Sequence, residues 1–195
     1  MKAIQSIPSA YQVIYAVNLQ KNKKTALFVN GLALLIAGAM VIPMHFFVPI
    51  SWLFDMENGI IRYFLRFLVL LLSLIAYMVC HELIHGMTMM AFGTKKVKYG
   101  FTGLYAFAGS EDYYDKKSYI IIALAPVVIF AVLFGIINFL VPYDWFWVIY
   151  MLQVCNISGA AGDFFVTVKF AKMPKDILVK DVGVGMTVYA KQQIQ

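Results

Sequence analysis

The stretch SYIIIALAPVVIFAVLFGIINFLV, residues 118–141, contains no charged residue. A helix needs about 20 apolar residues to cross about 30 Å of hydrocarbon, so this stretch is long enough to span a membrane. Three further runs reach the same length, at residues 25–50, 66–93 and 145–168. The sequence therefore predicts four transmembrane helices with these bounds.

The composition of the chain supports this prediction. Of its 195 residues, 62% are hydrophobic and only 13% are charged, whereas soluble domains are about half apolar and a quarter charged. A soluble protein of this composition would lack polar residues to cover its core. We therefore expect an all-α integral membrane protein, a four-helix transmembrane bundle in which residues 1–195 form a single membrane-embedded domain.

The basic residues indicate how the helices are oriented. Fourteen lysines flank one side of the predicted spans and two arginines flank the other. By the positive-inside rule, both termini, the middle loop and the tail 169–195 are cytoplasmic, as in a multi-pass protein of the bacterial plasma membrane. Anionic lipid is a sufficient partner for the net charge of +6, and no nucleic acid is needed to explain it.

The N-terminal residues are expected to form no cleavable signal peptide. Ile4, Ile7, Tyr11 and Ile14 recur at helical spacing, which predicts a short helix on the cytoplasmic membrane surface. A disordered leader is the alternative.

The second run contains an HExxH sequence, His81-Glu82-Leu83-Ile84-His85. On a helix, residues four apart lie on one face, so His81 and His85 can bind one zinc ion. Glu82 can then take a proton from a water molecule activated by the metal. Ionisable residues inside a span are costly without partners and usually functional. The alternative is a pair of polar residues that hydrogen-bond between helices.

Catalytic zinc usually has a third protein ligand, and Asp163 in NISGAAGDFF is the best candidate because it lies within a span. Gly159 and Gly162, with the alanines between them, allow a second helix to approach closely. The alternative for Asp163 is a capping aspartate. The other downstream acids lie in loops, on the far side of the membrane or in the tail: Glu111, Asp112, Asp115, Asp144, Asp176 and Asp181.

Asn156 lies two helical turns before Asp163. Its amide could orient a scissile carbonyl or donate to an oxyanion, and an interhelical hydrogen bond is an equal alternative. His45 is read as interfacial rather than as a ligand. Cys80 and Cys155 are read as small hydrophobes, with a ligand role only as a remote alternative.

Two segments outside the spans predict strands. Residues 96–109, KVKYGFTGLYAFAG, alternate loosely and contain three glycines, which indicates one or two short strands. Their edge could bind a substrate as an added strand, or the segment could be a re-entrant or packing loop. The tail sequence DILVKDVGVGMTVYA, residues 176–190, is also strand-like.

HExxH on one membrane helix, Ala125-Pro126 on the next and Asn156 with Asp163 on a third resemble the site-2 proteases. Chain length and the four-span layout look more like the zincin peptidase family of small bacterial membrane proteins. The resemblance implies that His81, His85 and Asp163 are zinc ligands and that Glu82 is catalytic. This chain differs from the site-2 protease pattern at two positions. Ile84 stands where those proteases commonly have glycine, and Gly162 precedes the aspartate, whereas their glycine follows it.

Two classes of function remain open from the sequence. The first is an intramembrane zinc metallopeptidase that cleaves membrane-associated peptides or proteins. The alternative is a non-catalytic membrane protein with a structural or regulatory zinc site. A metal transporter is less favoured, since it would need ionisable residues on both sides of the midplane.

Overall fold

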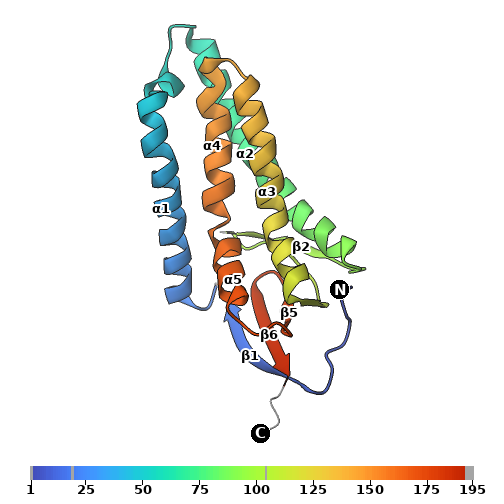
Figure 1. The fold of residues 1–195 in the computed structure, drawn as a ribbon. Helices are drawn as coiled ribbons and strands as arrows, with labels where there is room; N and C mark the ends of the chain where they lie inside the picture. The colour runs from blue at the N-terminus through green and yellow to red at the C-terminus, as the bar shows by residue number, and fades with distance from the viewer. Residues whose placement is uncertain (1, 19, 104, 192–195) are drawn as a thin grey trace. The chain divides into compact units, whose positions relative to one another are not determined.

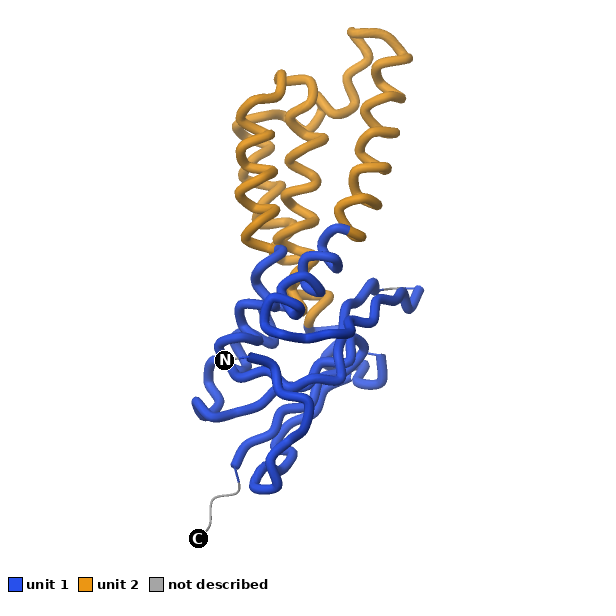
Figure 2. Tube along the Cα trace, turned by 90° about the vertical axis from the view of Figure 1, so that its right-hand side faces the viewer, with its two compact units in different colours: residues 1–28, 80–126, 163–195 blue, residues 29–79, 127–162 orange. Residues whose placement is uncertain are grey.

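The computed structural model describes residues 2–18, 20–103 and 105–191. The chain divides into two compact units, shown in Figure 2. Unit 1 comprises Met1–Phe28, Cys80–Pro126 and Asp163–Gln195, and unit 2 comprises Val29–Val79 and Val127–Gly162.

The long helices carry the apolar runs (Figure 1). In the part of the chain that the structure describes, four stretches are long and apolar enough to cross a membrane, with mean hydropathies of 2.2, 2.2, 3.1 and 1.2 along the chain, which agrees with the four apolar helical stretches predicted. The helices are α1 (Lys23–Phe47), α2 (Ile60–Ala91), α3 (Lys116–Leu140), α4 (Phe146–Gly159) and α5 (Ala161–Ala171), with 3-10 helices η1 (Ile50–Phe54) and η2 (Tyr143–Trp145).

The fourth apolar stretch is made of two helices rather than the continuous one expected over 145–168. Helix α4 ends at Gly159 and α5 begins at Ala161, with Ala160 between them at φ −78° and ψ 14°. Gly159 and Gly162 explain the break, because each glycine in a helix interior costs about 1 kcal/mol relative to alanine. The break puts Asp163 in the first turn of a new helix.

Unit 2 has an apolar core around η1 and the start of α4, formed by Val48, Leu53, Trp147 and Val148. Arg66 is buried beside it, with 1% exposure. Its guanidinium donates to the carbonyls of Trp52 at 3.0 Å and Asp144 at 3.3 Å, and also to that of Asp55. Arg66 therefore ties the connection between α1 and α2 to the connection between α3 and α4.

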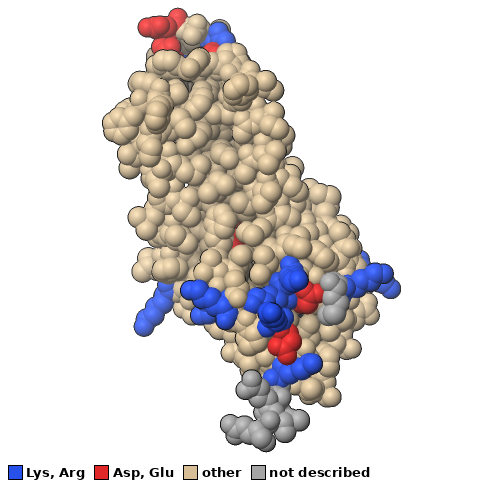
Figure 3. All heavy atoms as spheres, in the orientation of Figure 1, with Lys and Arg blue, Asp and Glu red and all other residues tan. Residues whose placement is uncertain are grey.

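The charged residues are distributed unevenly between the units. All fourteen lysines belong to unit 1 and both arginines to unit 2. In Figure 3 the charged side chains of unit 2 lie at one end of that unit, and lysine side chains are exposed at several places on the visible surface of unit 1. The charged residues of unit 2 are Asp55, Glu57, Arg62, Arg66 and Asp144.

Unit 1 contains a four-stranded antiparallel sheet with the order β1-β6-β5-β4. Its strands are β1 (Tyr11–Asn18), β4 (Tyr113–Asp115), β5 (Leu178–Asp181) and β6 (Gly185–Lys191). The strands β5 and β6 confirm the prediction for the tail. The description of the chain as all-α was too narrow, because this sheet is a substantial part of unit 1.

The predicted N-terminal surface helix was wrong. Residues 11–18 form strand β1, which pairs with β6 from Tyr11↔Lys191 to Asn18↔Gly185. The sequence YQVIYAVN is rich in β-branched and aromatic residues, which favour a pleated surface over a helix. Ile4 also forms a β-bridge with Tyr113, the first residue of β4.

A β-hairpin follows α2, as residues 96–109 predicted. Strand β2 (Lys98–Phe101) pairs with β3 (Ala106–Gly109), and Tyr99 lies opposite Ala108. The hairpin approaches the turn between β5 and β6 closely, since a Cβ on Gly109 would lie 2.3 Å from the Val182 carbonyl carbon. Only glycine permits this approach.

The core of unit 1 packs helices onto the sheet. Met89 of α2, Ile122 of α3 and Phe170 of α5 are at most 1% exposed and belong to one cluster with Val179 and Val188 of the sheet. Burial of each such side chain contributes roughly 1.5–3 kcal/mol. This shared core fixes the segments of α2, α3 and α5 that carry the candidate site.

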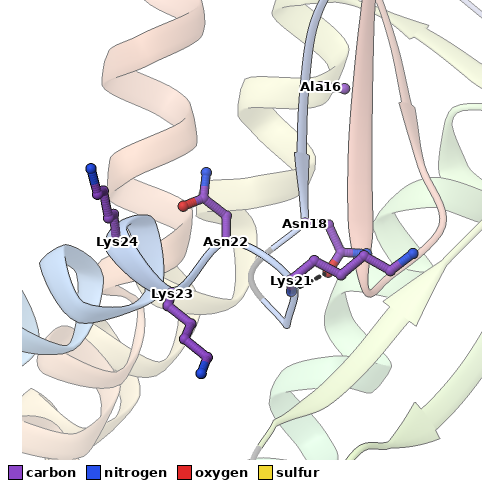
Figure 4. Close-up of a pocket in the computed structure, with 6 residues that line it drawn as sticks. All are labelled: Ala16, Asn18, Lys21, Asn22, Lys23 and Lys24. Atoms are coloured by element: carbon purple, nitrogen blue, oxygen red, sulfur yellow. Dashed lines mark hydrogen bonds between the residues drawn. The ribbon is translucent and has the colours of Figure 1, made fainter.

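A pocket of about 600 Å³ in unit 1 lies beside the start of α1 (Figure 4). None of its lining residues belongs to the HExxH segment or to α5. They are Ala16, Asn18, Lys21, Asn22, Lys23 and Lys24.

Candidate metal centre

Three potential metal ligands come together in unit 1. Each of His81, His85 and Asp163 offers one ligand atom, and these atoms lie within 4.8 Å of one another. The two Nε2 atoms are 3.2 Å apart. The Asp163 carboxylate oxygens lie 3.6 Å from the His81 Nε2 and 3.7 Å from the His85 Nε2. Helices α2 and α5 thus bring together the residues that the sequence proposed.

These separations fit a tetrahedral metal site. Two atoms bound to one zinc ion at about 2.0–2.2 Å in tetrahedral geometry are about 3.4 Å apart. The three observed distances lie within a few tenths of an ångström of this value. Two imidazoles and one carboxylate also form a donor set that leaves a fourth position open for water or substrate.

The site is partly shielded from solvent. His81 and His85 are each 8% exposed, and the Asp163 side chain is 23% exposed. His85 is further oriented by α3, because its Nδ1 lies 2.9 Å from the Ile122 carbonyl oxygen. A hydrogen bond from the second ring nitrogen is the usual support of a metal-binding histidine.

The β-hairpin contacts α2 next to these residues. The backbone N–H of Ala108 in β3 lies close to the Glu82 carboxylate. In β2, the Tyr99 hydroxyl lies against Gly86, where a Cβ would be only 2.0 Å from it. The cross-strand pair Tyr99 and Ala108 therefore contacts two residues of α2 that are one turn apart.

Comparison with known proteins gives the family. A family model with the description "Putative zincin peptidase" matches residues 74–178, more than half of the chain. The chain belongs to this family. The matched range includes His81, Glu82, His85 and Asp163. The description names a zinc peptidase, in agreement with the donor set above.

One curated relative of this zincin-family chain is from Pyrococcus woesei. It is described as "Uncharacterized 24.7 kDa protein in gap 5'region" and is 34% identical over 122 residues. The match covers 60% of this chain and 53% of the relative, so it spans about half of that protein's length. No solved structure matches the chain significantly.

Asn156 belongs to unit 2, where it is completely buried. Its Nδ2 donates to the Val127 carbonyl at 3.0 Å, and its Oδ1 accepts from the Tyr77 hydroxyl at 3.2 Å. These bonds join α4 to α3 and α2. They are interhelical hydrogen bonds, the alternative to a catalytic role for this residue. The catalytic role of Asn156 stays a prediction.

The remaining candidates have other surroundings. His45 accepts a hydrogen bond from the Ile50 N–H at 3.1 Å. Asp115 accepts from the Ser118 N–H at 3.0 Å, at the start of α3. Glu111 pairs with Lys98 and Lys180 at the surface. Cys80 is exposed and Cys155 half-buried, and neither is in the cluster of His81, His85 and Asp163.

The sequence did not indicate three features near the site: Tyr99, the Ala108 N–H and the burial of Asp181. Asp181 is 7% exposed and accepts hydrogen bonds from the Tyr119 hydroxyl at 2.5 Å and the Gly183 N–H at 2.8 Å. Backbone groups and long-range pairings leave no local pattern in a sequence. Gly86, directly after the HExxH segment, was the one available sign of a close neighbour.

Proposed function

We propose that this protein is an intramembrane zinc metallopeptidase that hydrolyses peptide bonds in or near the membrane. The observation that carries the proposal is the convergence of His81, His85 and Asp163 in a separation that suits one metal ion, with Glu82 adjacent to the first histidine. Family membership supports the same class of activity.

Membrane insertion is supported by the surface of unit 2. Leu34, Leu35, Phe46 and Phe47 on α1 are between 72% and 82% exposed, and water-soluble monomers rarely leave such extended apolar surfaces uncovered. Lipid is the proposed partner of these side chains. The distribution of lysines supports an orientation in the bacterial plasma membrane with both termini and the segment 94–117 in the cytoplasm.

In this proposal His81, His85 and Asp163 hold the metal and leave one position open. A bound zinc ion supplies Lewis acidity that lowers the pKa of water and polarises a carbonyl group. Glu82 accepts a proton from the attacking water and passes it to the departing amine. The Ala108 N–H lies close to this carboxylate.

The β-hairpin is the proposed binding surface for the substrate. Among the described residues, β2 pairs with β3 alone, so its other edge has no strand partner. An extended peptide could add to this edge through backbone hydrogen bonds. Because Tyr99 of β2 touches the residue after His85, a peptide on this edge would lie near the metal ligands.

The test compares wild type with Glu82→Gln and with a control, Glu57→Gln, in the loop before α2. Each purified protein is reconstituted in vesicles with a pool of peptides that each carry one transmembrane segment. Cleavage is followed by mass spectrometry and zinc content by elemental analysis. We expect all three proteins to bind one zinc ion and Glu82→Gln alone to lose cleavage.

Two results would contradict the proposal. Bound zinc without any cleavage by wild type would favour a structural or regulatory zinc site. Absence of zinc from wild type purified without chelators would exclude both functions.

A further inference from the structure

Helix α3 contains a proline, Pro126, at a completely buried position. In an α-helix each backbone N–H donates to the carbonyl four residues earlier. Proline has no N–H, so Pro126 cannot supply the helical donor to the Ile122 carbonyl. That carbonyl is the one that lies 2.9 Å from the Nδ1 of His85.

The contact fixes the protonation of the imidazole. A carbonyl oxygen only accepts, so the bond requires the proton of neutral His85 to be on Nδ1. The lone pair is then on Nε2, which faces the His81 Nε2 at 3.2 Å and the Asp163 carboxylate at 3.7 Å. The lone pair is therefore presented where the proposed metal binds.

We propose that Pro126 is a positioning residue for the metal centre. By removing one helical donor, it leaves the Ile122 carbonyl available to select the Nδ1-protonated tautomer of His85. The inference rests on the proposed metal site but not on peptide hydrolysis. It gives the Ala125-Pro126 sequence a role at the site that is separate from bending the helix.

The test is Pro126→Ala, which restores an N–H four residues after Ile122. The restored helical bond competes for the carbonyl and draws it back along the helix axis. Support of a metal-binding histidine from its second ring nitrogen typically contributes 10- to 100-fold to metal affinity. We expect zinc affinity, measured by competition with a chromophoric chelator, to fall by that factor.

The matched control is Pro43→Ala. Pro43 also lies inside a helix of 25 residues, α1, but four residues before it is Ala39, which is remote in sequence from the HExxH segment. We expect this variant to bind zinc with wild-type affinity. Cobalt-substituted samples of both variants add a spectroscopic measurement, because the d–d bands of Co²⁺ respond to a reoriented ligand and not to general destabilisation.

A second measurement needs neither metal nor a folded variant. The chain has three histidines, so nitrogen-15 NMR of the zinc-free wild type can assign the ring nitrogens of His85. We expect Nδ1 to carry the proton. A proton on Nε2 in the wild type, or unchanged zinc affinity in Pro126→Ala, would overturn the inference. Peptide cleavage is not measured in either experiment, so its absence would count only against the proposed function.

Discussion

The Tyr99 hydroxyl occupies the space that a side chain on Gly86 would need. A Cβ at residue 86 would lie 2.0 Å from the hydroxyl oxygen and 2.6 Å from the adjacent ring carbon. The glycine after the second histidine thus permits β2 to lie directly on α2, next to the candidate metal ligands. The relationship links a strand to the HExxH segment through one position without a side chain.

Gly86→Ala should therefore displace β2 from α2. Overpacking of this kind costs about 1–3 kcal/mol, and we expect thermal unfolding in detergent to show a loss of that size. The penalty should shrink when Tyr99 is also replaced by alanine, because the double variant removes the clash. Gly31→Ala is the control, since nothing lies within 4 Å of a Cβ at that helical position. An equal loss of stability on Gly86→Ala with and without the Tyr99 side chain would contradict the contact between Tyr99 and Gly86.

Asp163→Asn should weaken metal binding strongly. The amide keeps the shape of the side chain but loses the negative charge that a divalent cation requires in this donor set. We expect zinc affinity to fall more than about 100-fold, beyond the range typical of residues that only support a ligand. Asp176→Asn, in the tail, should bind zinc like the wild type. Stoichiometric zinc in Asp163→Asn after dialysis against a chelator would show that the third ligand is another residue.

The pairing of Glu111 should make the hairpin sensitive to acid. Hydrogen bonds and attraction from Lys180 and Lys98 lower the pKa of Glu111 from its ordinary 4.5 to about 2. The folded state thus has the lower pKa, so this pairing stabilises the fold above about pH 4.5 and is progressively lost as pH falls toward 2. The contribution is small because Glu111 is exposed.

This dependence can be isolated by comparing wild type with Glu111→Gln in thermal unfolding at pH 5 and pH 3. We expect the wild type to be the more stable at pH 5 and the difference to narrow at pH 3. Glu57→Gln, which alters a glutamate in unit 2, serves as the reference. If the difference in thermal stability between wild type and Glu111→Gln were larger at pH 3 than at pH 5, the pKa of Glu111 could not be lowered in the folded state.

Asn156→Ala separates packing from catalysis. The substitution removes the hydrogen bonds that Asn156 makes with the Tyr77 hydroxyl and the Val127 carbonyl, and each such bond contributes about 0.5–1.5 kcal/mol to stability. We expect lower thermal stability with kcat unchanged if the residue only joins helices. Tyr77→Phe removes one of the two bonds and should show a smaller loss. A fall in kcat without loss of stability would instead favour the oxyanion role.

The apolar runs allowed the long helices to be predicted from the sequence. The HExxH spacing, with the position of Asp163 inside an apolar run, singled out the three residues that the structure brings together. Both signals are local, since they depend on the length of an apolar stretch and on positions one helical turn apart. The strand at residues 11–18 was missed because its partner, β6, lies more than 160 residues later in the chain. A long-range partner leaves no trace in the local spacing of Tyr11 and Ile14, which also fits a helix.

The contacts that surround the site were less accessible to sequence analysis. The neighbour of the Glu82 carboxylate is a backbone N–H, and the partner of His85 is a backbone carbonyl. Every residue except proline carries both groups, so the residue type does not reveal such partners. Of these two backbone groups, only the Ile122 carbonyl could have been inferred from the sequence. Pro126, four residues later, has no N–H to donate to it. The helix break at Ala160 could likewise have been expected from Gly159 and Gly162, whose low helix propensity is known.

The restriction of lysine to unit 1 gives the chain two long segments that a lysine-specific endoproteinase cannot cut. Complete digestion would yield the fragments 25–95 and 118–169. The first carries both imidazoles and the second the carboxylate of Asp163. A metal ion shared by the three groups would therefore cross-link two separate polypeptides after digestion, in addition to the apolar packing and hydrogen bonds that already join them.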